Sequence, residues 1–254
     1  MIIKNYKIEK KICETRGSII YKTDQNTTIK IEKSGFTYLE NEIKIRKYLE
    51  KTNGILKILD FGSFKTNRFI VYNYVQECLF KKTMELPQIY NLANQMLDII
   101  ENIHNKGIVH CDISVCNIQY DRDNNIFYLN DFGQARHYTF AINEQKNRPL
   151  LGSPMFCSEN IHNKYDYSPR DDLISLTYVL ISMTIGKLPW YGNKEIKIIH
   201  EEKINFREKM WRYNIPEELK IFANYCFNLE INEKPNYTVV KKLFVNDKQL
   251  TIPT

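Results

Sequence analysis

The sequence has few of the features that mark a specialised structural class. It contains no low-complexity tract and no internal repeat, and 43% of its 254 residues are hydrophobic while 26% are charged. A chain of this length and composition can bury a sizeable core, as one large domain or as two closely joined lobes. The composition is therefore that of a globular protein without repeats, and it disfavours disorder for most of the chain.

The sequence also lacks a hydrophobic run that could span a membrane. Its longest apolar stretch, residues 173–185, is too short for a bilayer and includes serine and threonine, so it predicts a buried helix. The first residues, MIIKNYKIEKK, place lysines among the apolar positions and contain no cleavage site of a secretory signal. We expect an intracellular protein, cytoplasmic or nuclear, that is not secreted and has no membrane partner.

Patterns typical of disulfides, zinc sites and nucleic-acid binding are absent as well. The six cysteines include no CxxC pair and the five histidines form no ligand pair, which argues against a disulfide framework and against structural zinc. The net charge of +6 is spread along the chain without a basic block. We expect a monomer without specific nucleic-acid binding, while a preference of the basic surface for acidic protein partners stays open.

Strand-like patterns dominate the chain before residue 75, and helix-like patterns dominate it after residue 85. Short runs rich in Ile, Tyr and Thr indicate strands, and apolar residues at helical spacing indicate helices. The expected fold class is α+β, with a small antiparallel sheet in residues 1–75 and a larger helical part in residues 76–254. The expected strands are 6–12, 19–23, 27–32, 55–64, 68–75 and 126–130, and the expected helices are 37–49, 86–107, 171–186, 193–203, 216–229 and 235–244.

The segment HCDISVCN, residues 110–117, carries the polar spacing HxDxxxxN, and Asp131-Phe132-Gly133 follows downstream. Phosphoryl transfer from ATP needs carboxylate and amide oxygens to hold Mg²⁺, and an acceptor for the proton of the substrate hydroxyl. The spacing supplies all three, with Asp112 as the base and Asn117 and Asp131 as metal ligands. Taken alone, HxDxxxxN also occurs in small-molecule phosphotransferases.

Two charged residues upstream extend the pattern. Lys30 ends a strand-like run, where its ammonium group could reach the α and β phosphates, and Glu42 lies on the expected helix 37–49, where it could hold Lys30 in place. A strand lysine is usually a surface residue and a helix glutamate is usually solvated. The order Lys, Glu, HxDxxxxN and DFG favours a catalytic site over these alternatives.

With these motifs in this order, the sequence resembles the eukaryotic protein kinases over nearly its whole length. Residues 152–190, GSPMFCSENIHNKYDYSPRDDLISLTYVLISMTIGKLPW, are similar to the casein kinase I group and, within it, to the vaccinia-related kinases, and EKPNY at 233–237 resembles that group's KPxY motif. The resemblance implies a single bilobal protein kinase domain over residues 1–254, acting on serine and threonine with ATP and Mg²⁺. It also implies that Asp172 anchors the catalytic loop from the central helix.

The sequence departs from the kinase pattern in two loops. Cys13, Thr15 and Ser18 stand at the glycine positions of the family's GxGxxG loop, and we expect them to take the place of those glycines at the nucleotide. Ser114 replaces the lysine two residues after the catalytic aspartate, which is expected to lower the rate on the order of a hundredfold unless another cation substitutes. Cys111 replaces the arginine that pairs with a phosphorylated activation loop, so we expect activity without that modification.

Basic residues gather in the sequence around the expected substrate side of the site. A solvated loop and a site for acidic or pre-phosphorylated protein substrates are equally favoured. Two other functions stay open: a pseudokinase that binds partners by its kinase-shaped surface, favoured by the lost glycines and Ser114, and a small-molecule phosphotransferase. The basic residues are Arg136, His137, Lys146, Arg148 and Arg170.

Overall fold

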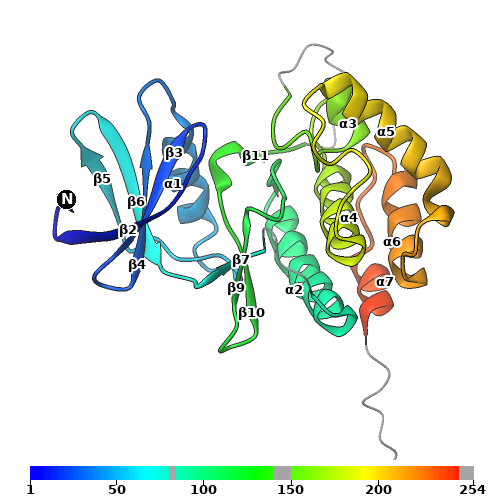
Figure 1. Ribbon diagram of the computed structural model, residues 1–254, viewed down its shortest axis with the longest axis horizontal. Helices are drawn as coiled ribbons and strands as arrows, with labels where there is room; N and C mark the ends of the chain where they lie inside the picture. Colours follow the sequence, from blue (N-terminus) through cyan, green and yellow to red (C-terminus); the bar gives the residue numbers. More distant parts are fainter. Residues whose placement is uncertain (80–83, 140–149, 246–254) are drawn as a thin grey trace, which may run out of the picture.

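The structure, a computed structural model, describes residues 1–79, 84–139 and 150–245. Its first part is a six-stranded antiparallel sheet in the order β1-β2-β3-β4-β6-β5 (Figure 1). The strands are β1 (Ile2–Ile3), β2 (Tyr6–Glu14), β3 (Ser18–Thr23), β4 (Thr27–Glu32), β5 (Asp60–Phe64) and β6 (Asn67–Asn73).

The central strand β4 is buried at every residue. Its sequence, TTIKIE, is rich in β-branched residues that suit a pleated surface, and β3 and β6 pair with it on both sides. Successive side chains of a strand point to opposite faces. Because Ile29 and Ile31 enter an apolar cluster on one face, Lys30 points to the other face, where helix α1 (Tyr38–Tyr48) packs through Leu39.

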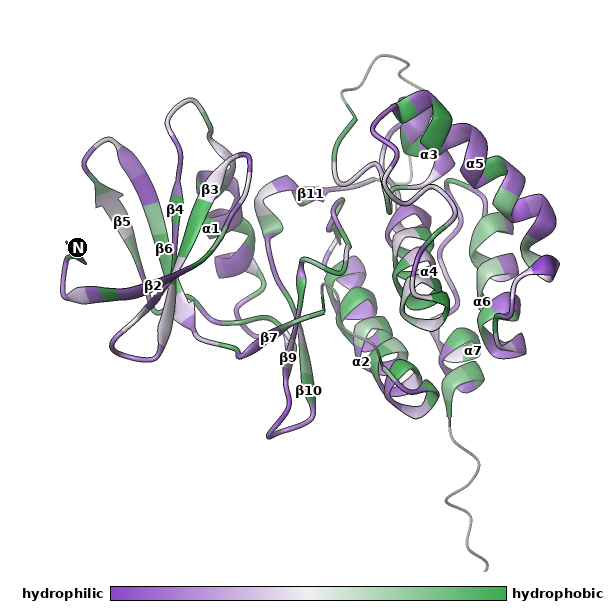
Figure 2. Cartoon of the chain, in the orientation of Figure 1, coloured by the Kyte–Doolittle hydropathy of each residue, from purple (hydrophilic) through white to green (hydrophobic). Residues whose placement is uncertain are grey.

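The second part of the chain is mainly helical (Figure 1). The apolar face expected for α2 is buried, and α4 is buried along nearly its whole length. In Figure 2, α2 and α5 carry alternating hydrophobic and hydrophilic segments, as helices with one buried face do. The helices are α2 (Leu86–Asn105), α3 (Glu159–His162), α4 (Pro169–Ile185), α5 (Ile196–Lys209), α6 (Glu217–Asn228) and α7 (Tyr237–Lys241), with 3-10 helices η1 (Phe132–Gln134), η2 (Met210–Arg212) and η3 (Lys242–Phe244).

Short strands between the two parts place the polar motifs. The strand β8 (Ile108–Val109) pairs with β11 (Arg136–His137), and β9 (Ile118–Asp121) pairs with both β10 (Ile126–Leu129) and β7 (Glu77–Cys78). The HxDxxxxN segment connects β8 to β9, and the DFG segment connects β10 to β11. The β8–β11 and β9–β10 pairings therefore hold the HxDxxxxN and DFG segments next to each other.

The expected α+β fold, with an antiparallel sheet before a helical part, is confirmed. The strand expected at 55–64 is wrong in its first half, because β5 begins only at Asp60. Ile55 and Leu56 are buried outside any strand, and the Leu56 carbonyl accepts a hydrogen bond from the Arg46 side chain. The helix expected at 171–186 begins two residues earlier, since Ser168 forms a capping box ahead of Pro169.

In residues 1–79, 84–139 and 150–245, no helix combines the length and the apolar composition needed to cross a bilayer.

Candidate active site

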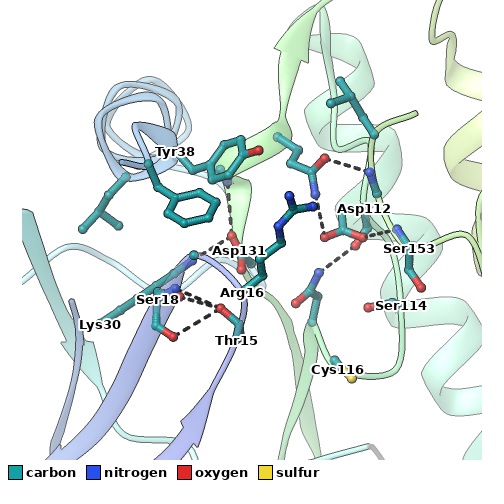
Figure 3. A pocket seen from close by; sticks show the side chains of 18 of the residues that line it. Thr15, Arg16, Ser18, Lys30, Tyr38, Asp112, Ser114, Cys116, Asp131 and Ser153 are labelled. Atoms are coloured by element: carbon teal, nitrogen blue, oxygen red, sulfur yellow. Dashed lines mark hydrogen bonds and ion pairs between the residues drawn. The ribbon is translucent and has the colours of Figure 1, made fainter. Parts of the chain in front are cut away.

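A cleft of about 410 Å³ lies between the sheet and the helical part (Figure 3). It is lined by the turn after β2, by β4, by the loop after β8, by η1 and its neighbours, and by residues 150–156. Cys13 and Glu42, both in the described part of the chain, lie outside this lining. The expected site residues that line the cleft are Thr15, Ser18, Lys30, Asp112, Asn117 and Asp131.

Two carboxylates fix the ammonium group of Lys30. Its Nζ lies 2.8 Å from Glu42 Oε2 and 2.8 Å from Asp131 Oδ1. Burial alone would lower the pKa of Lys30, but the negative charges of Asp131 and Glu42 outweigh this effect and hold the pKa above its ordinary value. Lys30 is therefore a buried cation, and its expected contact with Glu42 is present in the structure.

A buried arginine, Arg46, holds Glu42 from one turn further along α1. Its Nε donates to Glu42 Oε1 at 2.9 Å, and its other nitrogens donate to the Leu56 carbonyl at 2.9 Å and to Asn130 Oδ1. The guanidinium also lies over the Phe132 ring, 5.3 Å from its centroid. Glu42 is thus held by one cation on each side, which limits the rotation of its side chain.

Asp172, in the first turn of α4, binds the backbone of the HxDxxxxN segment. Its oxygens accept from the backbone N–H groups of His110 at 2.7 Å and Cys111 at 3.0 Å. Oδ2 also lies 2.9 Å from His104 Nε2. Cys111 has a φ of 66°, which is uncommon for a residue with a side chain. These bonds help to hold that conformation, and the geometry agrees with the anchoring expected of Asp172.

Both carboxylate oxygens of Asp112 accept hydrogen bonds. Ser153 N donates to Oδ1 at 2.9 Å, and Gln134 Nε2 donates to Oδ2 at 3.1 Å. Burial, together with the negative charge of Asp131, raises the pKa of Asp112 to about 7. A carboxylate with such a pKa can accept a proton near neutral pH.

Asn117 and Asp131 present oxygens that fit a divalent cation. Asn117 Nδ2 donates to the backbone carbonyl of Asp112 at 2.8 Å, so its amide oxygen points away from that bond. Asp131 uses Oδ1 for Lys30 and for Gly133 N, and its Oδ2 has no hydrogen bond to a described residue. Carboxylate and amide oxygens are suitable ligands for Mg²⁺, which usually keeps several waters and binds substrate phosphates as well.

The turn between β2 and β3 covers the cleft without the family's glycines. Thr15 Oγ1 and Ser18 Oγ lie 3.0 Å apart, and Ser18 N donates to Thr15 Oγ1 at 3.1 Å. Side chains thus close this turn, and its only glycine is Gly17. Cys13 is exposed on β2, and Ser114 is buried at the floor of the cleft.

The basic residues expected near the substrate side do not line the cleft. Arg170 donates to a backbone carbonyl that follows α6, at 2.7 Å. Arg136 and His137 lie on β11 and also fall outside the cleft lining. Lys146 and Arg148 lie outside the described residues. The described members of this group therefore form no shared basic site within the cleft.

The family model for the protein kinase domain matches residues 10–244, and this protein therefore belongs to the protein kinase domain family. Among solved structures, it is similar to the structure of vaccinia related kinase 3, with a TM-score of 0.81 and 22% identity over 94% of this chain and 85% of that chain. That likeness is one of fold. The eukaryotic-type kinase fold expected from the sequence is confirmed.

Sequence reasoning did not identify Arg46 and Gln134, although both contact expected site residues. The i, i+4 spacing of Glu42 and Arg46 on an expected helix is a signal that could have found Arg46. No local signal indicates Gln134, because its partner Asp112 is 22 residues away in the sequence.

Proposed function

We propose that this protein is a serine/threonine protein kinase that transfers the γ-phosphoryl group of ATP to protein hydroxyl groups in the presence of Mg²⁺. The observation that carries the proposal is the contact of Lys30 with both Glu42 and Asp131, in a cleft that Asp112 and Asn117 also line. Bringing charged groups out of water is unfavourable unless they are paired closely. The two carboxylates keep Lys30 charged where it lines the cleft, as a phosphate-binding cation requires.

Each of these residues has a defined part in the proposed reaction. Lys30, oriented by Glu42, binds the α and β phosphates of ATP. Asn117 and Asp131 hold Mg²⁺, which neutralises charge on the phosphates when bound. Asp112 accepts the proton of the substrate hydroxyl, whose oxygen forms a bond to the γ phosphorus while the bond from that phosphorus to the bridging oxygen of ADP breaks. The covering turn, with Thr15 and Ser18, lies at the phosphate side, and Cys13 lies at its edge.

The proposal includes the nature of the partner. A protein kinase domain implies protein substrates, and the excess of positive charge, +6 overall, favours segments that are acidic or already phosphorylated. We further propose that the protein acts as an intracellular monomer. None of these properties depends on the identity of the base or of the metal ligands.

A pseudokinase that binds partners through the same fold is the second candidate. Specific observations favour it, namely the absence of glycine at positions 13, 15 and 18 and the serine at position 114. The five retained groups around the cleft favour the enzyme instead. Nucleotide binding alone does not separate the two candidates, because both retain a cleft.

Phosphoryl transfer by the purified full chain separates them. The chain is incubated with γ-labelled ATP and Mg²⁺ and with three peptide pools in which Ser, Thr or Tyr is the only hydroxyl residue. We expect label in the Ser and Thr pools, and we expect Asp112→Asn to abolish it while nucleotide binding persists. Asp121→Asn makes the same chemical change on β9, outside the cleft, and should leave transfer intact.

Other outcomes identify other functions. Nucleotide binding without transfer to any pool, by protein that remains folded, contradicts the enzyme and supports the pseudokinase. Label in the Tyr pool alone contradicts the proposed hydroxyl preference. Label in an aminoglycoside or choline, with none in the peptides, supports a small-molecule phosphotransferase.

A further inference from the structure

Among the described residues that line the cleft, two are cations, Lys30 and Arg16. Lys30 is already paired with Glu42 and Asp131. The Arg16 side chain makes no hydrogen bond and no ion pair within the described part of the chain. Ser114, which stands two residues after the proposed base, brings no charge to the cleft. Arg16 is therefore the cation that remains available to a ligand there.

The turn that carries Arg16 is held firmly on both sides of it. Thr15 N donates to Ser18 O at 2.9 Å, which closes the turn around Arg16. Lys33 binds the turn twice, since its Nζ donates to the Thr15 carbonyl at 2.8 Å and its backbone N donates to the Gly17 carbonyl at 2.8 Å. The backbone of Arg16 thus has a fixed position over the cleft, although its side chain is exposed.

Gly17 allows the turn to lie close to the segment before α1. A Cβ at position 17 would lie 3.3 Å from the Phe36 ring, which is tighter than an ordinary contact. Figure 3 shows the Arg16 side chain directed from this turn into the cleft, toward the side where Asp112 and Asp131 lie. The guanidinium therefore extends to the part of the cleft in which phosphoryl transfer is proposed to occur.

We propose that Arg16 supplies to the transferring phosphoryl group the positive charge that residue 114 lacks, so that Arg16 and Ser114 form a compensating pair. The inference rests on the proposed function, because it assigns a contact to the γ-phosphoryl group of ATP. Arg16 gives and takes no proton in the reaction. It binds oxygens of the phosphoryl group while the bond to the bridging oxygen of ADP breaks and charge redistributes in the transition state.

The chemistry of arginine suits this task. Its guanidinium is planar, stays charged, and presents several N–H donors in a geometry that matches phosphate oxygens. In other phosphoryl-transfer enzymes, an arginine that reaches the transition-state charge raises the rate about 10³- to 10⁵-fold. A charged donor of this kind, carried by a fixed turn, would support activity despite Ser114.

Charge exchange between the two positions tests the proposal. We expect Arg16→Gln, which removes the charge and keeps a polar side chain, to lower kcat about a hundredfold and to raise the KM for ATP only about fivefold. Adding Ser114→Lys to Arg16→Gln should restore about tenfold or more of the loss, whereas Ser114→Lys alone should change kcat by less than about threefold. Lys10→Gln removes the same charge from the neighbouring exposed strand and should have no effect.

A binding measurement separates this inference from the proposed function. We expect Arg16→Gln to weaken binding of a non-hydrolysable ATP analogue at least about fivefold more than binding of ADP, because only the analogue carries the γ-phosphoryl group. If the wild type shows no transfer but Arg16→Gln still weakens the analogue more than ADP, the contact is supported while the proposed function fails. An unchanged kcat in Arg16→Gln, or equal weakening of the two nucleotides, overturns the inference even where the wild type is active. A loss of preference for acidic peptides alone would assign Arg16 to the substrate and also overturns it.

Discussion

The side-chain amide of Gln134 donates to Asp112 Oδ2 at 3.1 Å and accepts from Gly152 N at 2.7 Å. One side chain thus links the proposed base to the segment that closes the far side of the cleft. The second oxygen of Asp112 accepts from Ser153 N at 2.9 Å. Because the amide nitrogen and oxygen have different partners, Gln134 sets the orientation of the carboxylate plane.

Removing this contact should slow transfer without weakening nucleotide binding. We expect Gln134→Leu, which keeps the volume but loses both hydrogen bonds, to lower kcat about tenfold or more, since a hydrogen bond to a charged group contributes about 1.5–3 kcal/mol. The KM for ATP should stay nearly constant, because Gln134 is a positioning residue. Steady-state kinetics with varied ATP measures both constants.

Two further variants complete the test of Gln134. Gln134→Glu keeps an acceptor for Gly152 but places a negative charge against Asp112, so it should be at least as slow as Gln134→Leu. Gln25→Leu makes the same exchange in an exposed turn of the sheet and should match the wild type. A Gln134→Leu protein with unchanged kcat would show that Ser153 alone positions the carboxylate.

Arg46 should contribute strongly to stability because its charge is buried and paired. We expect Arg46→Met to lower the free energy of unfolding by about 3–5 kcal/mol, since it leaves Glu42 buried without one of its two cations. Urea denaturation followed by circular dichroism measures the change. The matched control is Lys44→Met on the same helix, where an exposed pair with Glu40 should contribute less than about 1 kcal/mol. Equal losses in both variants would contradict the prediction.

The sequence was sufficient for the groups whose roles follow from local order. Lys30 lies in a strand-like run and Asp131 follows one, so the alternation of strand residues and the spacing of the motifs already indicate their roles. Glu42 was predictable from helical spacing. Their roles could be assigned because the motifs stand along the chain in the order typical of protein kinases.

The remaining contacts depend on side-chain directions that no local pattern encodes. Gln134 reaches Asp112 only because β8 pairs with β11. The strand predicted at 55–64 begins later in the structure for a similar reason. The Leu56 carbonyl accepts a hydrogen bond from a side chain of α1 instead of from a neighbouring strand. Apolar residues there fill the core, and periodicity alone does not distinguish a buried loop from a buried strand.

The environment of His162 disfavours its protonation. Lys203 Nζ lies 3.2 Å from His162 Nε2, the His200 ring stacks on it at 5.0 Å, and Cys157 Sγ lies 3.5 Å away. Burial, and then the charges of Lys203 and His200, lower the pKa of His162 to about 3. The pKa of Lys203 is itself lowered, to about 8, mainly by burial, so Lys203 stays largely charged below that pH.

At His162, mild acid should therefore favour the unfolded chain, whereas the raised pKa of Asp112 acts in the opposite direction over the same pH range. The unfolded chain takes up a proton on His162 near pH 6.5 and the folded chain does not, so the stability present above about pH 6.5 is lost as the pH falls toward about 3. Between about pH 7.5 and pH 5 this linkage amounts to roughly 2 kcal/mol, and partial exposure of the ring reduces it to about 1. In urea denaturation, the change in stability from about pH 7.5 to pH 5 should be about 1 kcal/mol less unfavourable in His162→Gln than in the wild type. The exposed His137→Gln should show the wild-type change, and an identical change in all three proteins would contradict the assignment.

Gly152 should not tolerate a side chain, because it lies very close to the loop that carries Asp112. It has a φ of 78°, and a Cβ there would lie 2.5 Å from the Cys111 carbonyl oxygen, so the backbone next to the proposed base must move. Gly186 has a φ of 80° with no atom within 4 Å of its Cβ position, so Gly186→Ala isolates the conformational strain alone. We expect Gly152→Ala to lose more stability than Gly186→Ala and also to lose about a hundredfold in kcat, because small displacements of reacting groups have effects of that size. Thermal denaturation and transfer assays on both variants measure the difference, and equal kcat values would show that the loop absorbs the contact.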